Sequence, residues 1–165
     1  KVIPLCIAGS EHPELIHEIK SFRRVGDLKT YSAQEADCYM YLGKKPSKEV
    51  FFHCGIYKVR PDVQAVLHGH SAAATAYATA RNELPTLTAA SSAQIKKVGI
   101  VEFAPAGSKE LKEMVVEAFK DQELKACVLK RHGFITVGPS ITAAYYLGDV
   151  LEDNAKTLCY MSTLS

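Results

Sequence analysis

The chain has 165 residues, of which 47% are hydrophobic, and this fits one domain with a sizeable core. Its 20 Lys and Arg residues are mixed with 18 Asp and Glu residues, for a net charge of +2. This balance does not favour nucleic acid or an acidic membrane surface as a partner. No apolar run approaches the roughly 18 residues that cross a bilayer. We therefore expect no nucleic-acid partner and no membrane association.

The five cysteines are widely spaced, odd in number and without a C-x-x-C pair. This usage predicts a reduced, intracellular protein in which cysteines serve as small apolar residues. The N-terminal segment "KVIPLCIAGS" leads into a charged, helix-like segment, so we interpret it as a core strand and not as a signal peptide. Because the chain begins with Lys1 and not with Met, the interpretation allows for missing upstream residues.

In the first half of the chain, hydrophobic patterning predicts strands and helices in turn. Ser47 is the expected N-cap of the second helix, which ends at Pro61, and Ser71 is the expected N-cap of the third helix. The predicted elements are a strand over 2–8, a helix over 10–24, a strand over 37–43, a helix over 45–62, a strand over 63–68 and an alanine-rich helix over 71–82.

The second half continues the alternation, after a loop over 82–85. Ser108 and Ser140 are the expected N-caps of its two longer helices. The predicted elements are a short helix over 91–97, a strand over 99–104, a helix over 107–120, two strands or one bent strand around Gly133, and a long helix over 140–161. This order predicts an α/β fold in which helices cover a mixed sheet.

Two histidines stand at the end of the strand over 63–68, in "AVLHGHS". Residues i and i+2 of a strand share a face, so His68 and His70 are expected to project side by side, and Gly69 allows a close approach to the backbone. Paired histidines can also be ordinary polar groups. His132, before a glycine turn at the end of another apolar strand, is the best candidate for a third ligand. Three neutral imidazoles that leave an open position describe a catalytic Zn²⁺ site.

Four further residues are weighed beside these three. We interpret His12, His17 and His53 as surface groups or as supports of the ligands. Glu49 is a candidate proton carrier in the first turn of its helix, although the helix dipole alone would also favour a carboxylate there.

The ordered motifs of the chain resemble those of the class II aldolase/adducin family. The central segment is "PSKEVFFHCGIYKVRPDVQAVLHGHSAAATAYA", in which Glu49 precedes His68 by 19 residues, as in the family pattern. The segments "FAPAGS", residues 103–108, and "KRHG", residues 130–133, follow in the family order. The resemblance covers roughly residues 46–160.

The resemblance implies a three-layer α/β/α sandwich around a central mixed, partly antiparallel sheet, formed as a single domain over 1–165. It implies Zn²⁺, or another divalent metal, on His68, His70 and His132, with Glu49 as the acid/base group. It implies a lyase of cytoplasmic carbohydrate metabolism that cleaves a sugar phosphate by a retro-aldol reaction through a metal-stabilised enediolate. It also implies a homotetramer with the active site between subunits.

The chain departs from the family pattern where phosphate is bound. The family's N-terminal Gly-Asn-x-Ser loop is not recognisable before residue 46. Of the Ser-Ser pair before the glutamate only Ser47 remains, and Lys48 replaces the other serine while still able to attract an anion. Ser47, Lys48 and Gly69 are the candidate substrate-binding residues. The tyrosine that some members donate from a neighbouring subunit falls near Ala89.

Two other functions are compatible with the same resemblance. One is a methylthioribulose-1-phosphate dehydratase-like lyase, which also begins by forming an enolate. The other is a non-catalytic, adducin-like interaction domain, although such relatives have lost metal ligands that this chain keeps. Epimerase relatives carry an aspartate where Glu49 stands. A TIM-barrel hydrolase fits less well, because it typically needs about 250 residues.

Overall fold

A computed structural model of the chain describes residues 28–30, 39–41 and 48–164. The strand expected over 2–8 and the helix expected over 10–24 lie outside the described residues, as do His12, His17 and Ser47. Strand β1 (Leu28–Thr30) pairs antiparallel with β2 (Tyr39–Tyr41), which falls within the strand predicted over 37–43.

A four-stranded mixed sheet forms the centre of the protein, with the strand order β3-β6-β5-β4. Strand β6 pairs antiparallel with both β3 and β5, whereas β4 pairs parallel with β5. The segment around Gly133 therefore forms two antiparallel strands, not one bent strand. The strands are β3 (Ala65–Gly69), β4 (Val98–Val101), β5 (Ala126–Leu129) and β6 (Gly133–Gly138).

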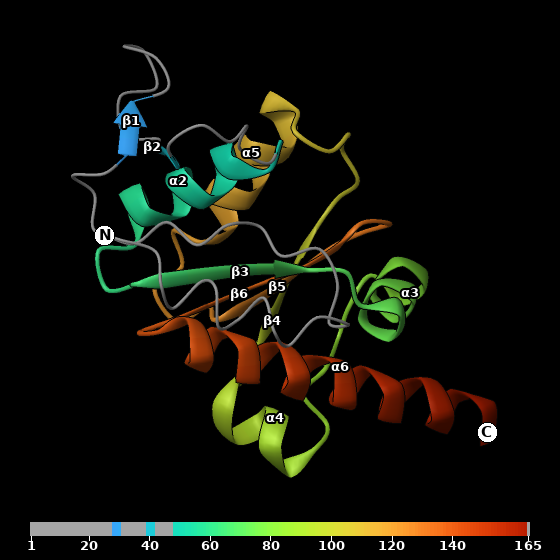
Figure 1. Cartoon of the computed structure of the whole chain (residues 1–165). Coiled ribbons are helices and arrows are strands. Elements are labelled where there is room, and N and C mark those ends of the chain that lie inside the picture. The colour runs from blue at the N-terminus through green and yellow to red at the C-terminus, as the bar shows by residue number, and fades with distance from the viewer. Residues whose placement is uncertain (1–27, 31–38, 42–47, 165) are drawn as a thin grey trace.

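Helices cover both faces of this sheet, which confirms the three-layer α/β/α prediction (Figure 1). On one face, α2 (Val50–Val59) and α5 (Lys109–Ala118) pack over a core that includes Phe52, Ile56 and Phe119. On the other face, α3 (Ala72–Arg81), α4 (Ala89–Gln94) and α6 (Ile141–Leu164) enclose a second core that includes Leu151 and Phe134.

Three of the four predicted helix caps are confirmed. The side chains of Ser71, Ser108 and Ser140 each accept a hydrogen bond from a backbone N–H in the first turn of the helix that follows. The prediction for Ser47 is wrong, because α2 begins only at Val50 and Glu49 occupies its N-cap position. Glu49 itself makes no side-chain cap hydrogen bond.

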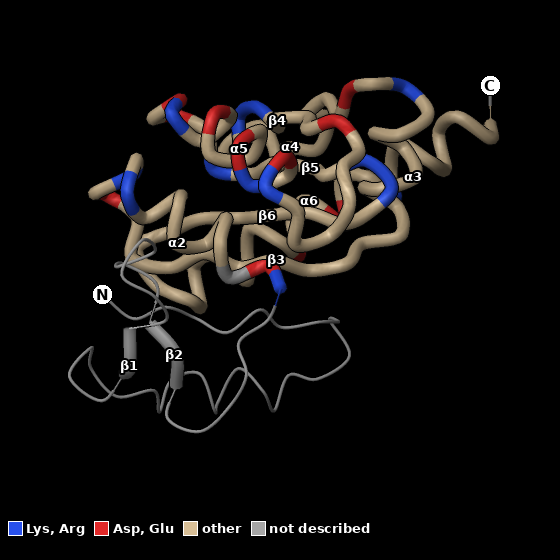
Figure 2. Tube along the Cα trace, turned by 90° about the horizontal axis from the view of Figure 1, so that it is seen from above, with Lys and Arg blue, Asp and Glu red and all other residues tan. Residues whose placement is uncertain are grey.

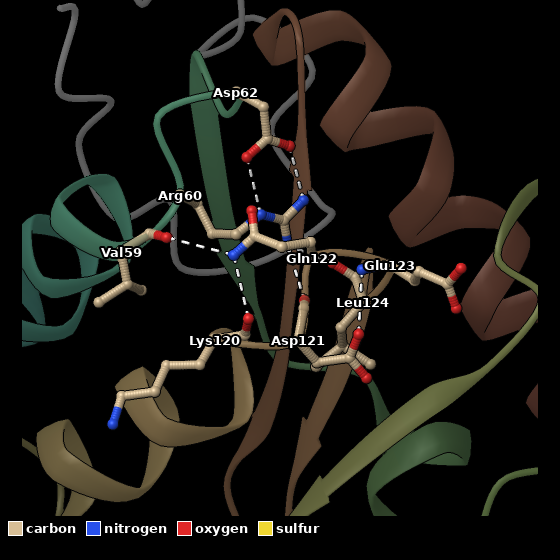
Figure 3. A network of polar contacts seen from close by, with 8 residues as sticks. All are labelled: Val59, Arg60, Asp62, Lys120, Asp121, Gln122, Glu123 and Leu124. Atoms are coloured by element: carbon tan, nitrogen blue, oxygen red, sulfur yellow. Dashed lines mark hydrogen bonds and ion pairs between the residues drawn. The ribbon is translucent and has the colours of Figure 1, made fainter.

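A buried arginine ties two connections of the fold together at the end of α2. The Arg60 side chain donates two hydrogen bonds of 2.8 Å to the Asp62 carboxylate, and two more to the carbonyl oxygens of Asp121 (3.2 Å) and Leu124 (2.8 Å) (Figure 3). Arg60 is 3% exposed, so these carbonyls have little access to water. The guanidinium thus joins the α2–β3 connection to the α5–β5 connection.

Replacing Arg60 with lysine is expected to lower the free energy of unfolding by about 2 kcal/mol. The single ammonium group of lysine cannot reach the carboxylate and both carbonyl oxygens that the planar guanidinium group bonds at once. Asp62 is half exposed, so Asp62→Asn is the matched control and is expected to cost less than about 1 kcal/mol. Urea unfolding of both variants measures the difference. Equal losses would show that the ion pair, and not the carbonyl contacts, carries the stabilisation.

The remaining surface features agree with the composition. Basic and acidic residues are interspersed along the described trace, as Figure 2 shows. Cys54 and Cys127 are buried, whereas Cys159 is partly exposed. None of the described helices combines the length and apolar character that a membrane-spanning segment requires.

Candidate metal centre

The three predicted ligands come together at one end of the sheet. One potential ligand atom from each of His68, His70 and His132 lies within 4.8 Å of the others. The ring centroid of His68 lies 5.1 Å from that of His70 and 4.9 Å from that of His132. This spacing confirms that the three imidazoles form a group that could hold a metal ion.

His68 is set up to offer its Nε2 atom. The Nδ1 atom lies 2.9 Å from the carbonyl oxygen of Phe134, which can only accept, so Nδ1–H donates and Nε2 keeps its lone pair. The Nε2 atom is buried without a hydrogen-bond partner among the described residues. Such a buried, unsatisfied acceptor is costly unless a ligand occupies the position. A hydrogen bond from the second ring nitrogen to a carbonyl is also typical of metal-binding histidines.

Burial and neighbouring imidazoles keep His68 and His132 neutral. Burial, followed by the charge of nearby His53, lowers the pKa of His68 to about 3. Burial and then the charge of His70 lower the pKa of His132 as well. Metal binding requires the neutral imidazole, so these residues are ready to bind at neutral pH.

The strand register explains why residues 64 positions apart meet. Gly69, at the end of β3, pairs with Phe134, at the start of β6, and His132 lies in the turn just before β6. A Cβ atom on Gly133 would lie 2.4 Å from the carbonyl oxygen of Gly69 and 2.9 Å from His70 Cδ2. Only glycine allows this approach, so Gly133 is a residue of the site that the sequence indicated merely as a turn.

Two contacts hold the turn that carries His132 and the segment that carries His70. Arg131 has a left-handed backbone (φ 59°), and its N–H donates to Thr79 Oγ1 in α3 at 3.1 Å. His70 precedes Ser71, whose hydroxyl donates to the Glu152 carboxylate of α6 while its oxygen caps α3. The loops that carry His70 and His132 are therefore both fastened to helices on the same side of the sheet.

Glu49 lies at the start of α2, which borders the histidines. Phe52, one turn further along α2, makes an edge-on contact with the ring of His68, with centroids 5.4 Å apart. Glu49 is 6% exposed, and this burial raises the pKa of its carboxyl group. A hydrogen bond from the Gly107 backbone and the charge of Lys48 oppose that rise. The Glu49 carboxyl group therefore holds its proton more readily than an exposed glutamate does.

The substrate-binding assignments of Ser47, Lys48 and Gly69 stay predictions. Lys48 is exposed beside Glu49, so it remains available to an anion. Gly69 is buried, and the ring of Phe134 occupies the space beside it, 2.8 Å from where a Cβ would lie. Packing therefore accounts for this glycine, and its contact with substrate stays a prediction. Ala89 is exposed at the start of α4.

His53 is not a surface group. It lies on the face of α2 that contacts the core, is 1% exposed, and its ring stacks on Phe52. Burial lowers its pKa to about 4. The mid-helix position in the sequence did not reveal this, because α2 presents an unusually broad buried face (Phe52, His53, Cys54, Ile56 and Tyr57).

Acid is therefore expected to destabilise the metal-free protein. As the pH falls below 6.5, the unfolded chain binds a proton at His53 but the folded chain does not until about pH 4. The cost from His53 alone approaches about 3 kcal/mol. Urea unfolding in EDTA at pH 7.5 and 4.5 should show a smaller loss for His53→Leu than for the unaltered protein. The same loss in both would contradict a neutral, buried His53.

Comparisons with known proteins agree with this architecture. Residues 24–159 match the family described as the class II aldolase and adducin N-terminal domain. An L-fuculose phosphate aldolase of Methanococcus vannielii is 38% identical over 112 residues, covering 68% of this chain and 60% of that protein. The enzyme of the same name from Escherichia coli K12 is 32% identical over 124 residues, covering 74% and 56%.

A solved structure of an L-fuculose 1-phosphate aldolase superposes with a TM-score of 0.70 at 27% identity, covering 77% of this chain and 59% of that one. The chain therefore belongs to the class II aldolase/adducin family. It spans about 60% of the length of the curated relatives that it matches.

Proposed function

We propose that this protein is a metal-dependent lyase that cleaves a carbon–carbon bond of a sugar phosphate in a retro-aldol reaction. The observation that carries the proposal is the buried Nε2 atom of His68, which is held without a described partner beside His70 and His132. The family relationship supports the same reaction class, since the relatives named above are aldolases.

His68, His70 and His132 would hold the metal, and Zn²⁺ suits a set of three neutral imidazoles. When bound, the metal polarises substrate oxygen atoms and stabilises negative charge that develops on them. Three protein ligands would leave the metal able to bind substrate as well. An open pocket of about 560 Å³ adjoins His70 and His132 along α3, and its small side chains leave room for a substrate there.

Glu49 would carry the proton at carbon. When the carbon–carbon bond breaks, its electron pair moves toward the carbonyl oxygen of one half, and the hydroxyl carbon of the other half becomes the aldehyde. The carbon that kept the electrons must then receive a proton, and the protonated Glu49 carboxyl group would supply it. Its raised pKa supports this role, because the protonated form persists to higher pH than in an exposed glutamate.

The proton that leaves the hydroxyl needs a second acceptor. Ala89 stands near the position expected for the tyrosine of some family members and cannot serve. We therefore propose that another residue, supplied by an adjacent subunit of a homotetramer, takes this proton. Light scattering of the full-length protein at micromolar concentration tests the assembly, and a monomer would contradict a shared site.

The reaction is tested with purified, Zn-loaded, full-length protein and a panel of ketose 1-phosphates. Release of dihydroxyacetone phosphate is the expected result. Formation of a dehydrated diketone from methylthioribulose 1-phosphate, without any dihydroxyacetone phosphate, would replace the aldolase proposal with a dehydratase. If neither product forms at full metal occupancy, the interaction-domain alternative is favoured.

A further inference from the structure

A tight turn from Pro105 to Ser108 lies beside Glu49, the residue to which we assign the proton transfer. The N–H of Ser108 donates to the carbonyl oxygen of Pro105 at 3.0 Å, and Gly107, the third residue of the turn, has a φ of 75°. These are the features of a type II turn, which requires a positive φ at its third residue and therefore favours glycine. Ser108 then caps α5, so the helix anchors the turn.

The backbone of this turn contacts the residues just before α2. A Cβ atom on Gly107 would lie 2.9 Å from Lys48 Cβ and 3.3 Å from the carbonyl oxygen of Lys48. The Gly107 N–H donates to the carboxylate of Glu49. A contact from a segment 58 residues away therefore helps to orient the Glu49 side chain.

We propose that Gly107 is a positioning residue: its backbone, placed against Lys48 by the turn, holds the Glu49 carboxylate in the orientation for proton transfer. The inference rests on the proposed role of Glu49. A side chain at position 107 would push the turn and residues 48–49 apart, and it would not alter the three histidines. A displacement of about 1 Å at a reacting group is enough to lower a rate by about 100-fold.

Two variants of Gly107 separate crowding from backbone strain. Gly107→Ala adds a Cβ and also strains the left-handed backbone, whereas Gly107→Asn adds the Cβ in a residue that tolerates a positive φ. Asn82, at the end of α3, also has a positive φ (58°), so Asn82→Ala is the matched control for strain alone. If Gly107→Ala fails to fold, Gly107→Asn carries the test.

We expect both Gly107 variants to lower kcat by about 100-fold, with unchanged metal content and little change in KM, and Asn82→Ala to keep kcat within about threefold. In the Glu49→Gln background, Gly107→Asn should cause no further loss, because the group through which it acts is already gone. A further loss of about 100-fold in that background, or near-normal kcat in Gly107→Asn alone, would overturn the proposal.

A crystal structure of the Gly107→Asn protein gives a readout that does not depend on turnover. The Glu49 carboxylate should be displaced while the rings of His68, His70 and His132 keep their places. An unmoved Glu49 would overturn the inference. Full activity of Glu49→Gln would instead contradict the proposed function of Glu49 itself, so the two failures are distinguishable.

Discussion

Glu49→Gln is expected to lower kcat for the proposed cleavage by about 10³-fold while the protein keeps its fold and its metal. The amide has nearly the same shape and can still accept a hydrogen bond from the Gly107 N–H, but it cannot exchange a proton at neutral pH. The loss should appear in kcat and not in KM, because the proton is transferred only as the reaction proceeds.

Turnover of Glu49→Gln with the proposed substrate is the measurement, alongside metal content and circular dichroism. Glu152→Gln is a useful control, since Glu152 accepts a hydrogen bond from Ser71 and the amide can do the same. A Glu49→Gln enzyme with near-normal kcat would leave the carboxylate only a structural role at the start of α2.

His132→Ala is expected to lower metal affinity by more than about 100-fold. Changing a residue that only hydrogen-bonds a metal ligand already lowers affinity by up to about 100-fold, and removing the ligand itself should cost more. Two imidazoles would remain, and one of them, His70, is exposed. Activity should fall with the metal content, because the proposed reaction depends on the metal that these histidines would hold.

Elemental analysis after dialysis compares His132→Ala with the unaltered protein. Lys130→Ala is the matched control from the same turn, because it removes the ion pair with Glu102 but leaves the imidazole in place. Equal metal content in the His132→Ala and unaltered proteins would contradict the assignment of this residue as a ligand.

Local patterns were sufficient to predict most elements in the described part of the chain. Ser71, Ser108 and Ser140 were recognisable as caps because a helix N-terminus needs acceptors within its own first turn, which is a local requirement. His68 and His70 could be paired from the period of a strand, and His132 from its place at the end of another strand. The family motifs added the α/β/α arrangement.

Other features depended on which strands became neighbours. The sequence does not state that β6 lies between β3 and β5, and only this order brings Gly133 against the backbone of Gly69. It also did not reveal that Arg60 would reach the carbonyls of Asp121 and Leu124, or that Gly107 would pack on Lys48.

The sequence by itself thus determined most of the described helices and strands, three of the four caps and the three candidate ligands, because these follow from interactions within a few residues. The tertiary structure alone decided the burial of His53, the start of α2 at Val50 and the contact between Gly107 and Glu49. The physical reason is that burial and close backbone approach are set by packing between segments distant in sequence, whereas periodicity and capping are set within one segment.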